Sequence, residues 1–328
     1  MKSIFFALLL LFSKVCIAQS DSTVREIEGI VRNLSDLQKT NRLDTIYDLR
    51  FANMNLQKVP RILRKCKNLK EIDLSNNHIK KLPKWLTKNR DSLRVLTFTH
   101  DDIEARKLKF SENQSLKTIN LSGCKLSQWP KQLAKNKNLS TLILAQNYLK
   151  SIPSEIINCQ NIKVLSFYEN KIRDITPLLG QMKRLVELDL YHNQLSEIPS
   201  VIFELDSLQT LALSYNSIQN LPEEIANLQQ LRQLYLRDNA LKALPQSLKT
   251  MPNLVQLYIE KNLFTTFPDV LLQMPQLIEI DLGKNKIKEI PDEIIDLKSL
   301  SMLDVRSNPL IKKKALLALK KTGVQVWE

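Results

Sequence analysis

The chain has 328 residues, with 48 lysines and arginines against 34 aspartates and glutamates, so its formal net charge is +14. Hydrophobic residues make up 43% of it and charged residues 25%, a balance that is typical of a folded protein and excludes a disordered one. Its five glycines are tens of residues apart, and its histidines and cysteines are isolated, so it holds no dinucleotide-binding glycine motif, no Walker A loop and no H-E-x-x-H or C-x-x-C motif.

The first segment, residues 1–18, has the pattern of a secretory signal peptide. Lys2 precedes a short apolar run, and Ala18 closes a small-residue site, so we expect cleavage that leaves Gln19 as the first residue. The run is too short for a comfortable membrane span, and no later stretch approaches the roughly 20 apolar residues that a span needs. A lipoprotein with a lipidated Cys16 and an uncleaved anchor stay open as alternatives. The short signal followed by Ala-Gln is typical of bacteria.

Residues 19–45 are expected to form an N-terminal helical cap. Thr23-Val-Arg-Glu26 matches a capping box, which favours the start of a helix. Apolar residues then recur with helical spacing at Val24, Ile27, Val31 and Leu34. Such a helix would cover the open end of the structure that follows.

From residue 46 onward the chain repeats itself with a fixed period of about 23 residues. Leu139-Ser-Thr-Leu-Ile-Leu-Ala-Gln-Asn-Tyr-Leu returns in the same form at Leu185 and at Leu231. Twelve units are visible, the last one incomplete, and a single step, from Leu69 to Leu93, is one residue longer than the others. Each unit reads L-x-x-L-x-L-x-x-N-x-L-x-x-L-P, in which leucines alternate with variable residues as in a strand with one buried face.

This pattern resembles the leucine-rich repeat family, in the 23-residue form that carries segments such as Leu221-Pro222-Glu-Glu-Ile225. The resemblance implies an α/β repeat solenoid: a horseshoe with a concave parallel β-sheet, a convex side of short helices or turns, and helical caps at both ends. The solenoid would cover residues 46–308. Residues 309–328 would form a C-terminal cap, with a basic amphipathic helix from Ile311 to Lys321 and a tail.

One asparagine in most units is interpreted as structural. Turned inward, its amide can satisfy backbone groups where a strand becomes a loop. This ladder consists of Asn77, Asn147, Asn170, Asn193, Asn216, Asn239, Asn262, Asn285 and Asn308. Met54, Asp101 and Cys124 stand at the same place in three other units. Cys66 and Cys159 occupy a core position, so we expect them to be buried and too far apart for a disulfide.

Aromatic residues gather on the variable places of the predicted concave face. Tyr235 and Tyr258 fall at the middle exposed place of their strands. Tyr168 and Tyr191 come just after the second strand leucine of their units, and His192 and Tyr215 come one residue further along. Tyrosine and arginine are favoured at binding hot spots, and the cluster would span about 19 Å. The predicted partner-binding residues are Tyr168, Tyr191, His192, Tyr215, Tyr235, Arg237, Tyr258 and Glu260. The alternative is that exposed tyrosines only fill a polar strand face.

A second feature is the basic stretch at residues 61–90, which has ten lysines and arginines against Glu71 and Asp73. It could face an anionic partner such as an acidic glycan or a lipopolysaccharide, or it could only keep a leucine-rich surface soluble. The sequence contains no recognised nucleic-acid-binding motif, so no nucleic-acid partner is expected.

Catalytic and metal-binding candidates are weak. His100-Asp101-Asp102 resembles a metal cluster, but Asp101 takes the inward asparagine place. Aspartates on exposed strand places, such as Asp189, Asp281 and Asp304, would lie on an open face that neither excludes water nor shifts pKa values much. We therefore expect no enzyme, metal or cofactor.

Two functions stay open for this chain. The first is an exported, non-enzymatic module that binds a protein or peptide on its concave face. The second is a cell-surface adhesion or structural protein that uses the basic N-terminal third. After export the chain could be periplasmic, attached to the cell surface or extracellular.

Overall fold

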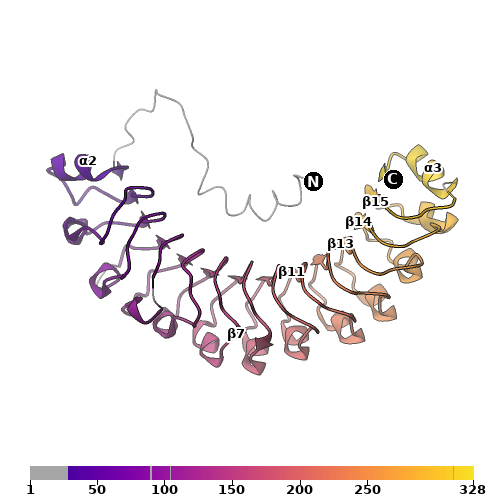
Figure 1. The fold of residues 1–328 in the computed structure, drawn as a ribbon, viewed down its shortest axis with the longest axis horizontal. Helices are drawn as coiled ribbons and strands as arrows, with labels where there is room; N and C mark the ends of the chain where they lie inside the picture. Colours follow the sequence, from indigo (N-terminus) through magenta and orange to yellow (C-terminus); the bar gives the residue numbers. More distant parts are fainter. Residues whose placement is uncertain (1–28, 89–90, 104, 313) are drawn as a thin grey trace.

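The computed structural model describes residues 29–88, 91–103, 105–312 and 314–328. The predicted signal peptide and capping box lie outside these residues. The described chain forms one curved arc, with the strands of the main sheet along its concave side and short helices along its convex side (Figure 1). This is the predicted solenoid, and the horseshoe shape is confirmed.

The concave face is a parallel sheet of 14 strands, and a separate two-stranded sheet joins β7 to β9. The strands are β1 (Ile30–Val31), β2 (Asp48–Arg50), β3 (Glu71–Asp73), β4 (Val95–Thr97), β5 (Thr118–Asn120), β6 (Thr141–Ile143), β7 (Ser151–Ile152), β8 (Val164–Ser166), β9 (Asp174–Ile175), β10 (Glu187–Asp189), β11 (Thr210–Ala212), β12 (Gln233–Tyr235), β13 (Gln256–Tyr258), β14 (Glu279–Asp281), β15 (Met302–Asp304) and β16 (Gln325–Trp327).

The convex side consists mainly of 3-10 helices, most of which begin directly after a proline. They are η1 (Arg61–Lys65), η2 (Lys84–Leu86), η3 (Ala105–Lys107), η4 (Lys131–Lys135), η5 (Ser154–Cys159), η6 (Pro177–Gln181), η7 (Ser200–Glu204), η8 (Glu223–Asn227), η9 (Gln246–Thr250), η10 (Asp269–Gln273) and η11 (Asp292–Asp296). Two α-helices, α2 (Leu34–Lys39) and α3 (Lys314–Lys321), lie near the two ends of the arc (Figure 1). In the described part of the chain, no helix has the length and apolar character needed to cross a bilayer.

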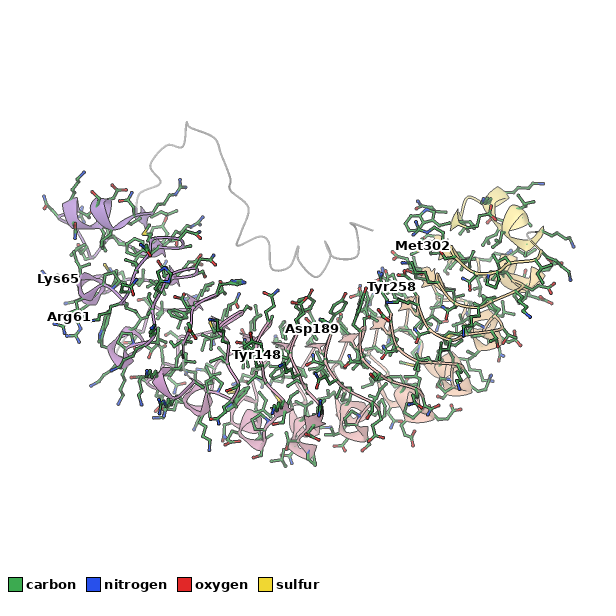
Figure 2. All side chains as sticks on the ribbon, viewed as in Figure 1. Arg61, Lys65, Tyr148, Asp189, Tyr258 and Met302 are labelled. Atoms are coloured by element: carbon green, nitrogen blue, oxygen red, sulfur yellow. The ribbon has the colours of Figure 1, made fainter. Side chains whose placement is uncertain are left out.

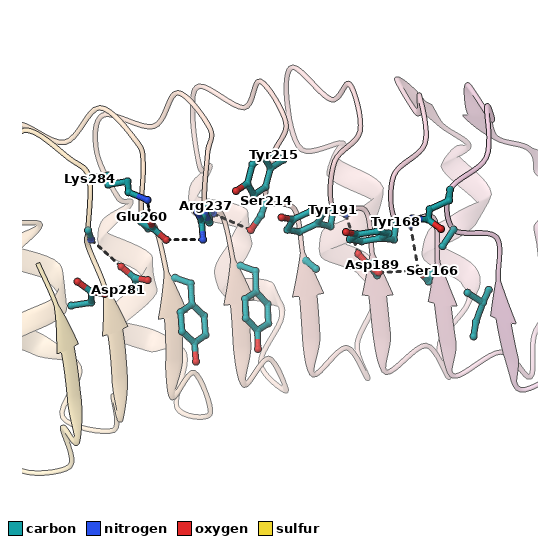
Figure 3. Close-up of a pocket in the computed structure, with 18 of the residues that line it drawn as sticks. Ser166, Tyr168, Asp189, Tyr191, Ser214, Tyr215, Arg237, Glu260, Asp281 and Lys284 are labelled. Carbon is teal, nitrogen blue, oxygen red and sulfur yellow. Dashed lines mark hydrogen bonds and ion pairs between the residues drawn. The ribbon is translucent and has the colours of Figure 1, made fainter. Parts of the chain in front are cut away.

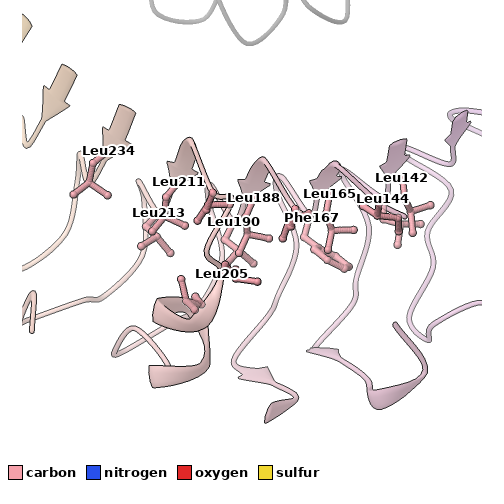
Figure 4. Close-up of a cluster of buried hydrophobic side chains, with 14 of the residues drawn as sticks. Leu142, Leu144, Leu165, Phe167, Leu188, Leu190, Leu205, Leu211, Leu213 and Leu234 are labelled. Atoms are coloured by element: carbon pink, nitrogen blue, oxygen red, sulfur yellow. The ribbon is translucent and has the colours of Figure 1, made fainter. Parts of the chain in front are cut away.

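The repeat period sets the register of the sheet. Leu188 is paired with Leu211, and Leu211 with Leu234, so each leucine lies beside its equivalent in the next repeat unit, which forms one coil of the solenoid. These side chains point inward in rows and are fully buried (Figure 4). Each coil can cover them only with its neighbours, so the core is continuous along the solenoid.

The ladder asparagines tie consecutive coils together through their side-chain amides. Asn193 accepts a hydrogen bond from the backbone N–H of Ile172 at 2.9 Å and donates to the carbonyls of Phe167 and Leu190. The other eight asparagines repeat this pattern. Cys124 takes over part of the role, because its thiol donates to the carbonyl of Phe98 at 3.0 Å.

The cysteines at the core places are buried, as predicted. Cys66 and Cys159 are both fully buried, and neither forms a disulfide within the described residues. Burial raises the pKa of the Cys159 thiol to about 11, so it stays protonated and packs as a small apolar group.

Both ends of the sheet differ from the prediction. The predicted helix through Val31 is wrong, because Val31 lies in β1 and pairs with Leu49 of β2, so that the helix begins only at Leu34. At the other end, α3 begins at Lys314 and not at Ile311, and it leads into the unpredicted strand β16. The physical reason is the same at both ends: an unpaired sheet edge is covered by one more strand.

Candidate binding groove

A groove of about 750 Å³ runs along the concave face and is lined by residues from β5 to β16 (Figure 3). Seven of the eight predicted partner-binding residues line it: Tyr168, Tyr191, Tyr215, Tyr235, Arg237, Tyr258 and Glu260. His192 does not line it. It is exposed beside the groove, with its ring edge-on to Tyr191 and Tyr215 at 6.5 and 6.0 Å.

The repeat places the groove residues in rows that cross the strands. The last residue of each strand from β8 to β15 in the main sheet forms the floor, which runs Ser166, Asp189, Ala212, Tyr235, Tyr258, Asp281 and Asp304. The place two residues later forms the next row, which runs Tyr168, Tyr191, Ser214, Arg237, Glu260, Gly283 and Arg306. Strands in a sheet are about 4.8 Å apart, so neighbours in one row are in contact.

Tyr235 and Tyr258 form the centre of the floor. Their rings stack with centroids 4.7 Å apart and an angle of 2° between the planes, and the Tyr258 hydroxyl donates to Glu279. They are only 7% and 6% exposed, so the prediction that they stand on an exposed place is wrong. The two rings cover each other across the narrow strand spacing, and they give the groove an apolar base.

Three tyrosines form a second aromatic group, here called the tyrosine shelf: Tyr168, Tyr191 and Tyr215. Tyr191 lies in the middle, with centroid distances of 4.9 Å to Tyr168 and 4.8 Å to Tyr215. Tyr215 has a left-handed φ of 56°, as does the equivalent residue of most coils, and this turn follows the strand. All three rings are half-buried, so they remain available to a ligand.

The far part of the groove is charged, and its six residues are called the charged corner: Arg237, Glu260, Asp281, Lys284, Asp304 and Arg306. Glu260 forms ion pairs with Arg237 at 3.0 Å and with Lys284 at 2.9 Å. Asp304 accepts from the side chain and the backbone N–H of Arg306. The corner is therefore a preorganised polar network and not a set of mobile surface charges.

The floor aspartates are buried, contrary to the prediction of an open face that leaves pKa values unchanged. Asp189 accepts hydrogen bonds from the Ser166 hydroxyl and the Tyr191 backbone, yet burial raises its pKa to about 6. Burial also raises the pKa of Asp281 to about 7. The reason is the curvature of the sheet, which brings side chains of neighbouring strands together on the concave side and removes water from between them.

Sequence reasoning missed several groove residues. Lys284 and Arg306 line the groove near the floor aspartates Asp281 and Asp304 but belong to no aromatic cluster. Trp327 of β16 also lines the groove and lies under the Arg306 guanidinium at 4.7 Å. A signal for β16 was present, because Trp327 and Val326 stand one full repeat period after Asp304 and Leu303. The intervening helix hid this continuation of the period.

The chemistry of the groove is that of a binding surface with an apolar floor, aromatic edges and fixed charges. Within the residues that the structure describes, no group of three or more histidine, cysteine, aspartate or glutamate side chains is arranged to hold a metal ion. Hydrogen-bond donors, acceptors and both signs of charge nevertheless converge on it, as in sites that bind and orient a ligand.

Comparisons with known proteins agree with the fold. Models described as leucine rich repeat match residues 137–195, 183–241 and 242–310, and also 68–89 and 115–136. A comparison with curated proteins gives no significant match.

Solved structures with the same fold come from bacteria and plants. A leucine-rich repeat protein of Leptospira interrogans is 27% identical, with 92% of this chain and 82% of that chain covered and a TM-score of 0.78. An internalin of Listeria monocytogenes is 21% identical, with 90% and 92% covered and a TM-score of 0.69. The ectodomain of the Arabidopsis thaliana receptor kinase GASSHO1/SCHENGEN3 is 24% identical, with 81% and 39% covered and a TM-score of 0.58. The chain therefore belongs to the leucine-rich repeat family.

Proposed function

We propose that this protein is an exported, non-enzymatic binding module that holds a peptide or a protein segment in its concave groove. The observation that carries the proposal is the groove itself, a preformed hollow of about 750 Å³ with a stacked tyrosine floor and fixed charges. A rigid site loses little conformational entropy on binding, so its contacts contribute more fully to affinity.

The shape of the groove favours an extended chain. It crosses ten strands of the main sheet from β5 to β16, which is roughly 43 Å at ~4.8 Å per strand. An extended segment of about twelve residues has this length. The Arabidopsis ectodomain of the same fold was solved in complex with Casparian strip integrity factor 2, which supports a binding role for this architecture.

The aromatic residues favour a peptide over a sugar. Sugar rings stack on open aromatic faces, but the faces of the tyrosine shelf are largely covered by one another, and Arg237 lies over Tyr215 at 5.4 Å. The hydroxyl groups of Tyr168 and Tyr191 are already hydrogen-bonded, to Glu169 and Tyr215, so what remains open is ring edges. These suit the mixed apolar and hydrogen-bonding surface of a polypeptide.

The test is a pair of tyrosine variants measured against a partner isolated from the native source. Tyr191→Ala removes the middle ring of the shelf, whereas Tyr148→Ala removes a 48% exposed tyrosine outside the groove. We expect Tyr191→Ala to weaken binding by more than about 1 kcal/mol, or about fivefold, and Tyr148→Ala to leave it unchanged. Equal affinities for both variants in calorimetry would count against the groove.

Export is the second part of the proposal, and it rests on the pattern of residues 1–18. Cleavage after Ala18 gives a mature chain that begins at Gln19. N-terminal sequencing of protein from the native source tests it. A chain that retains Met1 contradicts cleavage, and a lipidated Cys16 at the terminus supports the lipoprotein alternative.

A second candidate function is adhesion to an anionic surface through the basic N-terminal third. Arg61 and Lys65 of η1 lie on the convex side (Figure 2), and Arg64 lies over the ring of Trp85 at 5.0 Å. Within residues 61–88, the described lysines and arginines form no ion pair, so their charge is open to a partner. Binding to lipopolysaccharide that falls steeply as salt rises would favour this function, and salt-insensitive binding would oppose it.

A further inference from the structure

Asp281 is the carboxylate of the charged corner that has no cation of its own. Among the described residues, Glu260 and Asp304 each hold a basic side chain, whereas Asp281 accepts only from the backbone N–H of Gly283, at 2.9 Å through Oδ1. Its Oδ2 has no hydrogen bond or ion pair within that part of the chain. Asp281 is 3% exposed and lines the groove (Figure 3), so this oxygen can be reached only from the groove.

The residue beside Asp281 leaves an opening above it. Gly283 is the one groove-lining member of its row without a side chain, and its φ is not in the left-handed region, so the backbone there does not require glycine. A Cβ at this place would lie 3.2 Å from Asp281 Oδ1 and 3.3 Å from Glu260 Cγ. A longer side chain would extend from there into the space over the carboxylate. The glycine therefore keeps Asp281 accessible between Glu260 and Arg306.

The charged residues of the groove indicate the sign of the charge that the ligand carries. The chain as a whole carries +14, but four carboxylates and three cations line the groove. The carboxylates are Asp189, Glu260, Asp281 and Asp304, and the cations are Arg237, Lys284 and Arg306. Asp189 is satisfied by Ser166 and the backbone. Glu260 pairs with two of the cations and Asp304 with the third, so Asp189 and Asp281 have no cation among the described residues, and of these two only Asp281 has an oxygen without a hydrogen-bond donor there. A buried carboxylate of this kind is stabilised by a cation that also donates hydrogen bonds.

We propose that Asp281 receives a lysine or arginine side chain from an extended segment of the partner, an inference that rests on the proposed function of the groove. The spacing of the site adds a requirement on the ligand. Tyr191 follows β10 and Asp281 ends β14, four strand spacings or about 19 Å apart. An extended chain covers this distance in about six residues, so the basic side chain lies about six positions from the residue that contacts the tyrosine shelf.

A phage-displayed library of random peptides of about twelve residues, long enough to span the groove, tests the proposal. Peptides selected on the wild-type chain at pH 8 are synthesised with an acetylated N-terminus, and their affinities are measured for four chains: wild type, Tyr191→Ala, Asp281→Asn and Asp296→Asn. Asp281→Asn removes the charge and keeps the shape. Asp296→Asn removes an equal charge from the convex helix η11, where the side chain is exposed. In a second arm, norleucine replaces the basic residue of each peptide.

We expect the selected peptides to bind Tyr191→Ala more weakly than wild type. We also expect them to carry a lysine or arginine about six positions from the residue that contacts the tyrosine shelf. They lose about tenfold or more in affinity on Asp281→Asn, because a charge-assisted hydrogen bond contributes at least this factor, and they lose nothing on Asp296→Asn. Norleucine should cause the same loss in wild type and none in Asp281→Asn. Circular dichroism of Asp281→Asn shows whether the variant is folded.

Other results separate the two proposals. Tyr191-dependent peptides that lack a basic residue, or that bind Asp281→Asn as well as wild type, overturn the role of Asp281 and leave the groove function intact. Peptides that bind only with a free N-terminus also overturn it, since the cation is then a terminal ammonium group. A selection that yields no Tyr191-dependent peptide overturns the groove function and this inference together.

Discussion

The asparagine ladder gives a prediction whose magnitude follows from single hydrogen bonds. In Asn193→Ala, the backbone N–H of Ile172 loses its acceptor, and Ile172 is fully buried, so no water can replace it. An unsatisfied buried donor costs about 1–3 kcal/mol. The amide also donates to the carbonyls of Phe167 and Leu190, which keep second donors in Asn170 and Asn216, so each of these losses costs only about 1 kcal/mol.

The free energy of unfolding should therefore fall by about 3–5 kcal/mol in Asn193→Ala. The matched control is Asn220→Ala, because Asn220 is exposed and has no side-chain hydrogen bond to a described residue, and we expect it to change stability by less than about 0.5 kcal/mol. Urea unfolding followed by circular dichroism measures both. If Asn193→Ala loses no more stability than Asn220→Ala, the ladder does not hold the coils together, and the backbone groups that lose their partners do not destabilise the fold.

Two further predictions concern the charged corner and the last strand. The pKa of Asp281 is raised to about 7 by burial and by the nearby Asp304 and Glu260, against the opposing effects of the Gly283 backbone N–H and of Arg237, so the folded state holds a proton that the unfolded state releases near pH 4. Asp281 should contribute up to about 4 kcal/mol to the stability that wild type loses between pH 4 and pH 7, and Asp281→Asn should remove this contribution and leave the part that the raised pKa of Asp189 supplies; equal slopes in urea titrations contradict it. Deleting residues 325–328 uncovers the edge of β15, so size-exclusion chromatography should show self-association, and an unchanged monomer would argue against a capping role of β16.

The repeat made most of the fold predictable. Its fixed period sets the register of Leu188, Leu211 and Leu234, so the strands, the buried rows and the concave face follow from counting. The grouping of Tyr168 with Tyr191 could be predicted for the same reason, since equivalent residues lie side by side. These features depend on local spacing alone, which a sequence shows directly.

Features that depend on the curvature of the sheet, and on how the sheet begins and ends, could not be predicted from the repeat. Asp281 and Tyr258 were expected on an exposed place, but neighbouring strands cover them, and a repeat pattern does not show how closely side chains approach across a curved sheet. The strand at Ile30–Val31 lies outside the period, since Val31 pairs with Leu49, which follows it by less than one full repeat. The accessible oxygen of Asp281 depends on the missing side chain of Gly283, which is visible only in three dimensions.

Photo-cross-linking can show whether the partner lies in the concave groove. Benzoylphenylalanine is introduced in place of Tyr191 within the groove, and separately in place of Tyr148 outside it, so that an aromatic ring replaces an aromatic ring in both cases. After irradiation with extract from the native source, we expect one specific adduct from the chain substituted at Tyr191 and none from the chain substituted at Tyr148. An adduct that forms from Tyr148 and not from Tyr191 would contradict this expectation.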